Sequence, residues 1–294
     1  ADRMLDMGFE PAVRAIVENH SMPSKEERQT MMFSATFAEE CQKMAQDFLY
    51  DYIWIGVGVV GGAVETVEQR LEKVNPKEKY GKLVEILDDF FVKRGPEDRA
   101  LVFVNAKDTA KWLDEQLYEK HMDTGALHGN LDQWEREKNL SRFRKGEIDV
   151  MIATDVAARG LDIESVVMVI NYDMPQDIDS YIHRIGRTGR IGNSGTAITF
   201  ISCDEQYGNC LENADTLKRL LQVMQDSKAS VPDWLEGTVQ EALGGHKAQW
   251  RWGGQDMRPD QETLHGNGAG GEWSNWRGGS SGGQQGQDAW KSSW

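Results

Sequence analysis

The sequence has few cysteines, no long apolar run and no signal-like start. No stretch of about 18 apolar residues occurs in its 294 residues, so we expect no membrane span. The first residues, ADRMLDMGFE, lack the basic-then-apolar order of a signal peptide and do not begin with Met, which favours a chain cut from a longer protein. The three cysteines are too few and too scattered for a disulfide framework or a zinc site. We therefore expect a reducing compartment, the cytosol or the nucleus.

A net positive charge and a phosphate-binding loop are also missing. The formal net charge is −15 and the pI is about 4.9, which argues against indiscriminate nucleic-acid binding through overall charge. Any polyanion site must then be local. The loop GxxxxGK[ST] does not occur. Its nearest counterpart, KYGKL at 79–83, has Pro76 where the first glycine belongs and Leu83 where Ser or Thr belongs.

From about residue 64, apolar β-branched segments alternate with amphipathic ones. We expect strands at 100–105, 149–155, 166–173 and 195–202. We expect helices at 79–91, 109–120, 132–145, 177–187 and 214–225, the third stopped by Gly146. This alternation predicts an α/β fold, a parallel sheet with helices on both faces. Ligands bind at the carboxyl ends of the strands in such folds, where Asn105, Asp155 and Asp173 lie.

The sequence on either side of this region has a different character. Residues 1–60 predict helices at 11–20 and 38–49 and strands at 28–36 and 52–60. The second helix has one apolar face, formed by Cys41, Met44, Ala45 and Phe48. Gly61-Gly62 indicates a flexible joint. Residues 236–294 are rich in Gly and Trp and are expected to be mostly disordered. We thus predict three parts, 1–60, 61–235 and 236–294.

The segment YIHRIGRTGRIGNSG, residues 181–195, concentrates cations. Arg184, Arg187 and Arg190 follow one another at steps of three with glycines between them, and acidic residues are absent from 180 to 203. Arginines without local carboxylates, beside glycines that let a backbone approach closely, suit a phosphate oxyanion. A solvated basic face is the alternative interpretation.

A second segment, 150–166, places polar groups directly after a strand. Thr154 can offer its hydroxyl and its backbone N–H to a phosphate, and an Asp can accept from ribose hydroxyls. An ordinary strand-to-helix turn capped by Asp155 explains the same residues.

A third segment, 126–146, combines a loop with the start of a helix. Gln133 and Arg136 lie one helical turn apart beside the His128-Gly129 loop. Together with the free amides of a helix start they suit a nucleic-acid phosphate. A salt-bridged surface helix is the alternative. The short SAT stretch at 34–36 would by itself indicate only a turn.

In this order, the segments resemble those of the DEAD-box RNA helicases of superfamily 2. The matching stretches cover roughly residues 1–235 and read ADRMLDMGFEP, SAT, LVFVNAK at 101–107, HGNLDQWER at 128–136, ATDVAARGLD at 153–162 and HRIGRTGR at 183–190. Ala1 and Asp2 resemble the last two letters of the family's Asp-Glu-Ala-Asp box. The segments at 56–63 and 230–236, and the Gly-rich, Trp-containing tail, resemble the Vasa branch of that family.

The resemblance implies two RecA-like domains that close on ATP–Mg²⁺ and single-stranded RNA. Residues 1–60 then correspond to the C-terminal remnant of the first domain and 61–235 to the whole second domain. ATP and Mg²⁺ would be bound mainly by a first domain that lies largely before residue 1. We therefore expect residues 1–60 to be poorly folded in isolation and this chain alone to hydrolyse no ATP.

The resemblance also implies roles for individual residues. Arg187 and Arg190 correspond to the arginine fingers at the γ-phosphate of ATP, and Asp162 to the ribose contact. His183 corresponds to the link between domains, toward Asp2 of the acidic box and Ser34 and Thr36 of the SAT stretch. The RNA-backbone contacts correspond to Gly129, Gln133, Arg136, Thr154 and Arg159.

The Vasa likeness implies a cellular setting and partners. We expect a monomer in the cytoplasm of germ cells, in perinuclear germ granules, acting on single-stranded RNA or short RNA duplexes beside germ-granule proteins. Two other functions fit the same segments: a non-catalytic RNA- or protein-binding module on a RecA-like fold, and a DNA translocase of the same superfamily. The RGG at 277–279 among the tail tryptophans suits RNA stacking, and an inert solvated tail is the alternative.

Overall fold

The computed structural model describes residues 1–6, 8–19, 21–36, 39–56, 63, 66–158, 165–189, 194–204 and 209–248. Among the helices of these ranges, none is long and apolar enough to cross a membrane. The expected joint at Gly61-Gly62 and the tail from residue 249 onward lie outside the described residues.

Six parallel strands form the sheet that organises the second part of the chain. Along the sheet they follow the order β1-β6-β5-β2-β4-β3. Their bounds are β1 Val67–Val74, β2 Arg99–Val104, β3 Thr124–Leu127, β4 Val150–Thr154, β5 Val166–Asn171 and β6 Gly195–Asp204. A short strand, β7 Asn209–Cys210, pairs antiparallel with the end of β6. The expected parallel sheet is therefore confirmed.

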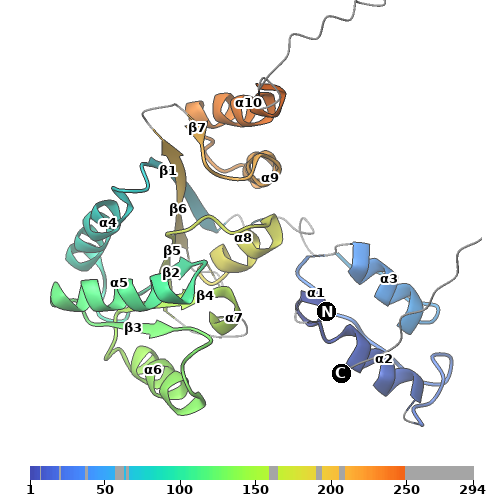
Figure 1. The fold of residues 1–294 in the computed structure, drawn as a ribbon. Coiled ribbons are helices and arrows are strands. Elements are labelled where there is room, and N and C mark those ends of the chain that lie inside the picture. The colour runs from blue at the N-terminus through green and yellow to red at the C-terminus, as the bar shows by residue number, and fades with distance from the viewer. Residues whose placement is uncertain are drawn as a thin grey trace, which may run out of the picture. The chain divides into compact units, whose positions relative to one another are not determined.

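Helices cover both faces of this sheet, as Figure 1 shows for α4 and α5 on one side and α8 and α9 on the other. Within β2, Leu101 and Phe103 join the core under α8, α9 and α10, whereas Ala100, Val102 and Val104 join the core under α4 and α5. Successive side chains of a strand point to opposite faces, so a strand buried on both faces must be apolar throughout. The helices are α4 Lys79–Lys93, α5 Lys107–Glu119, α6 Gln133–Lys145, α7 Asp155–Ala158, α8 Ile178–Ile185, α9 Ala214–Asp226 and α10 Asp233–Ala248.

The ends of α6 show how local sequence sets a helix. The Glu135 backbone N–H donates to Asp132 Oδ1 at 2.7 Å, and the Asp132 N–H donates to Glu135 Oε2 at 3.3 Å, so the two residues form a capping box. Gly146 ends the helix in the left-handed region, with φ 75°. A residue without Cβ reaches that conformation at little cost. The predicted stop at Gly146 is confirmed.

The N-terminal part contains α1 Asp2–Asp6, α2 Glu10–Asn19 and α3 Glu39–Phe48. Both predicted helices are confirmed, and the predicted apolar face of α3 is the buried one. The strands expected at 28–36 and 52–60 are wrong for the residues described: 28–36 and 52–56 form no strand. Phe33 is 79% exposed and Ile53 is 86% exposed. A strand needs a neighbour for its backbone groups, and apolar residues alone do not supply one.

Several elements were not expected from the sequence, among them β1, β3 and α10. In β1 the exposed and buried residues alternate, with Val67, Gln69 and Leu71 facing inward, and this period of two was the available signal. β3 has only four residues, too few for a pattern. α10 runs to Ala248, beyond residue 235 where we expected the sheet domain to end.

Candidate functional site

Arg184 binds the carboxyl ends of three strands together. Its side chain is 1% exposed and donates to both carboxylate oxygens of Asp155 at 2.6 Å. It also donates to the Asp173 carbonyl oxygen and to Asn105 Oδ1, each at 2.7 Å. The guanidinium lies 5.2 Å from the centroid of the Phe103 ring. A guanidinium is a planar fork of donors, so these bonds fix α8 against the ends of β2, β4 and β5.

The interpretation that these arginines suit a phosphate oxyanion is therefore wrong for Arg184, whose guanidinium is occupied by groups of the same chain. Its partner Asp155 lies 29 positions away in the sequence, which the local pattern could not show. The polar residues expected at the strand ends do converge, but here they hold an arginine of the same chain. The carboxylate of Asp173 has partners of its own: it accepts from Lys79 Nζ and from the Asn105 backbone N–H, both at 3.1 Å.

The turn after α8 needs its glycines for packing. Thr188 is 1% exposed, and its hydroxyl donates to the Val166 carbonyl oxygen at 2.6 Å. Gly189 has φ 67°, and its carbonyl oxygen accepts from Thr66 Oγ1 at 2.8 Å. A Cβ on Gly195 would collide with Thr188 Oγ1. These contacts hold the turn against the first residues of β1, β5 and β6. They also fix the backbone next to Arg187.

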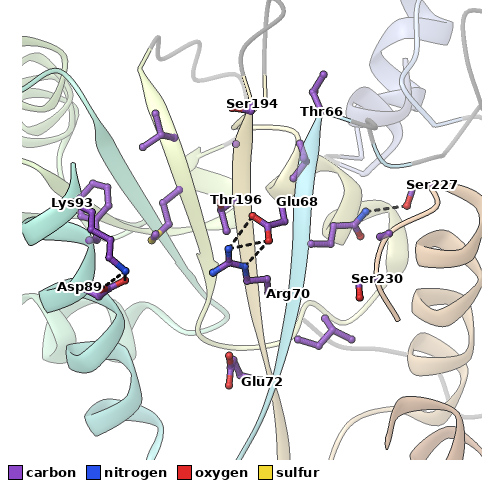
Figure 2. Close-up of a pocket in the computed structure, with 18 of the residues that line it drawn as sticks. Thr66, Glu68, Arg70, Glu72, Asp89, Lys93, Ser194, Thr196, Ser227 and Ser230 are labelled. Atoms are coloured by element: carbon purple, nitrogen blue, oxygen red, sulfur yellow. Dashed lines mark hydrogen bonds and ion pairs between the residues drawn. The ribbon is translucent and has the colours of Figure 1, made fainter. Parts of the chain in front are cut away.

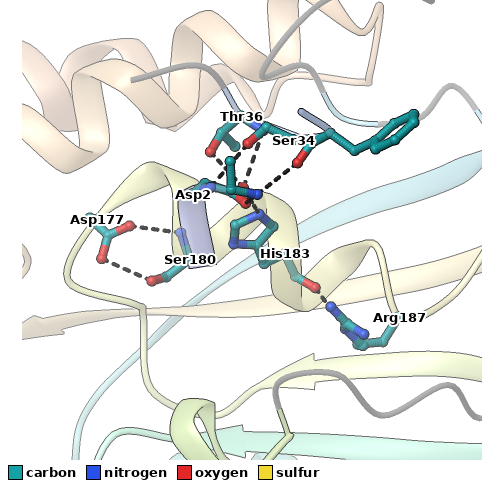
Figure 3. Close-up of polar contacts among 9 residues, drawn as sticks. Asp2, Ser34, Thr36, Asp177, Ser180, His183 and Arg187 are labelled. Atoms are coloured by element: carbon teal, nitrogen blue, oxygen red, sulfur yellow. Dashed lines mark hydrogen bonds and ion pairs between the residues drawn. The ribbon is translucent and has the colours of Figure 1, made fainter. Parts of the chain in front are cut away.

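Asp2 joins the N-terminal part to α8 through one carboxylate oxygen, as Figure 3 shows. Asp2 Oδ2 accepts from Thr36 Oγ1 at 3.0 Å and lies 3.1 Å from His183 Nε2. The Asp2 backbone N–H donates to Ser34 Oγ at 3.2 Å. Thr36 is buried, and the Asp2 side chain is 13% exposed. The structure thus brings together four of the residues that the resemblance singled out.

Arg187 lies one helical turn beyond His183 and is partly exposed. Its Nε donates to the His183 carbonyl oxygen at 3.1 Å, also drawn in Figure 3. The start of α8 is fixed by Asp177, which accepts from the Ser180 backbone N–H at 2.7 Å and from its hydroxyl at 2.9 Å. Capped at its start and anchored by Arg184, α8 presents His183 and Arg187 from a rigid support.

A second group of predicted residues follows β3. Gly129 is exposed, and a Cβ there would meet nothing within 4 Å. Gln133 is exposed and donates to Glu137 Oε1 at 2.8 Å. Among the described residues, none accepts from the Arg136 guanidinium, which is partly exposed. Thr154, at the end of β4, is 9% exposed.

Three predicted residues, Arg159, Asp162 and Arg190, lie outside the described residues. Their implied roles stay predictions. Of the described ones, Asp2, Ser34, Thr36, His183 and Arg187 form one group around α8. Gly129, Gln133 and Arg136 form another around the start of α6, with Thr154 on the neighbouring strand β4.

His128 is a buried residue next to this second group, and sequence reasoning gave it no role. It follows β3 directly and is 8% exposed. Its Nδ1 has no hydrogen-bond partner among the described residues. Burial lowers the pKa of the imidazole, since the charged form loses hydration. His128 is therefore buried directly beside the exposed Gly129, and its burial favours the neutral form.

A cavity of about 1010 Å³ lies at the edge of the sheet, between β1 and the last turns of α4, as seen in Figure 2. Two pairs of its charged side chains are bonded to each other. Arg70 donates to Glu68 at 2.9 and 3.0 Å, which lowers the pKa of that carboxyl, and Lys93 donates to Asp89 at 2.8 Å. None of the sequence-predicted site residues lines it. The candidate site therefore lies elsewhere, around α8 and the start of α6.

The residues present fit a nucleotide only in part. A partly exposed guanidinium such as that of Arg187 suits a phosphate oxyanion. No group of three or more His, Cys, Asp or Glu side chains that could hold a metal ion occurs in the described ranges. The sequence also contains no phosphate-binding loop.

Comparison with known proteins gives two family matches in the expected order. Residues 1–44 match the DEAD/DEAH box helicase family, and residues 78–192 match the helicase conserved C-terminal domain. The chain is 46% identical over 237 residues to the ATP-dependent RNA helicase DDX4 of Mus musculus, a Vasa homologue, which confirms the expected likeness. That alignment covers 80% of this chain and 32% of the relative, so the chain spans about a third of its length.

Solved structures give the same assignment. The yeast DEAD-box splicing factor Prp28 is 32% identical with a TM-score of 0.53, covering 81% of this chain and 51% of that one. Dbp5 of S. cerevisiae, solved bound to RNA and ADP BeF3, is 26% identical with a TM-score of 0.56, covering 79% of this chain and 61% of that one. With both family matches in sequence order over a RecA-like sheet, the chain belongs to the DEAD-box family of RNA helicases.

Proposed function

We propose that this chain is the C-terminal half of an ATP-dependent RNA helicase that binds the backbone of single-stranded RNA and supplies arginines to ATP hydrolysis. The observation that carries the proposal is the Asp2 carboxylate shared by Thr36 and His183. It connects the acidic-box remnant and the SAT stretch to the helix that presents Arg187. A change at the nucleotide can thus be passed to α8 and to the sheet behind it.

The RNA contacts are assigned to Gly129, Gln133, Arg136, Thr154 and Arg159. The support is the surface left at the start of α6: an exposed glycine with open space above it and an arginine whose guanidinium has no acceptor among the described residues. Contacts to phosphate and sugar carry no sequence information, which suits an enzyme that acts on many RNAs. RNA strands and short duplexes are the proposed substrates.

The nucleotide contacts are assigned to Arg187 and Arg190 at the γ-phosphate and Asp162 at the ribose. When bound, ATP with Mg²⁺ would supply the phosphoryl group, and Arg187, Arg190 and Asp162 are the residues of this chain that would contact the nucleotide. The guanidinium groups offset the negative charge that develops on the transferred phosphate, an effect of roughly 10³ to 10⁵ in rate. His183 positions Arg187, because its carbonyl oxygen accepts from Arg187 Nε.

RNA-stimulated ATP turnover of the full-length protein tests the arginine assignment. We expect Arg187→Ala and Arg190→Ala each to reduce turnover by at least about 10³-fold while the fold is kept. Arg70→Ala, an exposed arginine on the edge strand β1, is the matched control and should turn over ATP normally. Near-normal turnover in both finger variants would refute the assignment. The chain of 294 residues alone should show no ATP turnover.

RNA affinity measured at several salt concentrations tests the second group. Arg136→Ala should weaken binding of single-stranded RNA of any sequence and reduce the salt slope by about one. Arg144→Ala, an exposed arginine near the other end of α6, is the control. Equal affinity of both variants, with an unchanged slope, would favour a protein-binding module. A stronger stimulation of turnover by DNA than by RNA would favour the translocase.

The cellular setting is proposed from the likeness to DDX4. We place the full-length protein in the cytoplasm of germ cells, in perinuclear granules, as a monomer with granule proteins as partners. A fluorescent fusion expressed at the native level should concentrate in such granules. A uniform signal through nucleus and cytoplasm would contradict this setting without affecting the helicase assignment.

A further inference from the structure

Two cysteines face each other across the short antiparallel ladder between β6 and β7. The register pairs Cys203 with Cys210 and Asp204 with Asn209. The Leu211 backbone N–H donates to the Ser202 carbonyl oxygen at 2.9 Å. Hydrogen-bonded and non-hydrogen-bonded pairs alternate along an antiparallel ladder, so Cys203 and Cys210 form a non-hydrogen-bonded pair. In such pairs the Cα atoms lie only about 4.5 Å apart, and the side chains are at their closest.

This geometry suits a disulfide. A disulfide requires a Cα–Cα separation of about 4.4–6.8 Å. The separation of about 4.5 Å that is typical of a non-hydrogen-bonded pair falls within that range. Directly paired residues point to the same face of a ladder. Cys203 belongs to the core beneath α9 and α10, and Cys210 packs against the same core. Both thiols are free.

The two thiols differ in access and acidity. Cys203 is 1% exposed, whereas Cys210 is partly exposed. A hydrogen bond from the Cys203 thiol lowers the pKa of Cys210 to about 7, with a further backbone hydrogen bond near Glu212 and the charge of Lys73 acting in the same direction. The hydrogen bond and burial both raise the pKa of Cys203. When protonated, Cys210 donates to the Ser202 carbonyl oxygen at 3.6 Å.

We propose that Cys210 and Cys203 are a peroxide-sensitive thiol pair, with Cys210 as the attacking thiolate and Cys203 as the resolving thiol. The Cys210 thiolate attacks one oxygen of hydrogen peroxide; an S–O bond forms, the O–O bond breaks, and hydroxide leaves. The Cys203 thiol then attacks the sulfur of the Cys210 sulfenic acid; the S–S bond forms, the S–O bond breaks, and water leaves. Two thiols are oxidised, and one peroxide is reduced.

The pair stands apart from the helicase machinery. Neither cysteine is among the residues assigned to RNA or nucleotide, and the proposal does not rest on those assignments. The sequence alone gave no reason to connect them, because a spacing of seven residues fits many arrangements. The register of the β6–β7 ladder places the two cysteines opposite each other. In a reducing compartment such a disulfide is transient and reports an oxidant.

The reduced chain of 294 residues, exposed to hydrogen peroxide and then unfolded and alkylated, tests the proposal. Of its three thiols, we expect two to escape alkylation and the intact mass to fall by two hydrogens. Cleavage after Glu205, which lies between the two cysteines, should give peptides that stay joined until a reductant is added. Buried Cys41 on α3 is the internal control and should be alkylated throughout. Three alkylated thiols after oxidation, or a bond to Cys41, would overturn the proposal.

Single variants test the two roles. In Cys203→Ala, the sulfenic acid on Cys210 cannot be resolved and should be trapped by dimedone. In Cys210→Ala, Cys203 should remain a thiol, and Cys41→Ala should form the disulfide at the normal rate. The oxidation rate of the unaltered chain should rise as the pH is raised through about 7, because the thiolate of Cys210 is the reactive form. Dimedone labelling of Cys203 instead would reverse the roles. If a variant fails to fold, the mass measurement on the unaltered chain decides.

Discussion

The sheet domain at 66–248 and the N-terminal part at 1–56 use the same kinds of residues with different results. In the sheet domain, apolar segments become strands because each has a neighbour that takes up its backbone hydrogen bonds. In the N-terminal part, the segments at 28–36 and 52–56 also contain apolar residues but form no strand, and several of their large apolar side chains, such as Phe33 and Ile53, are exposed. Among the residues described there, α3 is the helix that buries an apolar face. Apolar composition therefore permits a strand, and the neighbouring strand decides whether it forms.

Hydrogen exchange should show the largest difference between the two regions. Amides in β2 and β4 should open only with the free energy of global unfolding, about 5–15 kcal/mol. Amides at 28–36 and 52–56 should open with free energies near zero, because no partner strand protects them. Exchange of the native chain followed by mass spectrometry measures both. Slow exchange throughout residues 10–60 would show that the two regions do not differ in local stability.

Arg184→Met should destabilise the sheet domain most among single changes. The substitution leaves the Asp155 carboxylate, the Asn105 amide oxygen and the Asp173 carbonyl oxygen without their donor. Breaking a buried ion pair on one side costs about 3–5 kcal/mol. Urea unfolding measures the loss. Arg187→Met, three residues along and partly exposed, is the matched control, with an expected cost below about 1 kcal/mol. Equal costs would show that the Arg184 network contributes little.

Two glycines allow a packed position to be compared with an exposed one. Gly195→Ala should cost about 1–3 kcal/mol, because its Cβ would collide with Thr188 Oγ1 and lie 2.7 Å from the Gly189 backbone nitrogen. Gly129→Ala meets open space. It should leave stability unchanged or raise it by up to about 1 kcal/mol, since the unfolded chain loses freedom. Thermal unfolding checks both. A destabilised Gly129→Ala would mean that the loop is packed.

The bond between Asp2 and His183 should give the smallest effect. A double-mutant cycle with Asp2→Asn and His183→Gln should yield a coupling of about 0.5–1.5 kcal/mol, typical of one hydrogen bond. Urea unfolding of the four chains at one pH measures it. Thr36→Val in place of His183→Gln is a second cycle on the same carboxylate oxygen. Zero coupling in both cycles would show that the contacts of Asp2 do not couple the stability of the N-terminal part to α8.

Much of the fold was predictable, and the failures have physical causes. The strands β2, β4, β5 and β6 were found because a strand buried on both faces is continuously apolar. β1 was missed, although its alternation was legible, and β3 was missed because four residues carry no period. Of the site residues, those in HRIGRTGR stood out by composition. The role of Arg184 did not, because Asn105, Asp155 and Asp173 come from three separate strands.

The sequence by itself determined most of the helices, most of the sheet, the likeness to the DEAD-box family and the absence of a phosphate-binding loop, since all of these depend on local pattern. The tertiary structure decided which arginine is held inside, which glycines are needed for packing, how Asp2 meets His183, and that Cys203 faces Cys210. Each of these is a contact between residues distant in the sequence or set by strand register. Composition and spacing do not fix such contacts; strand order and packing do.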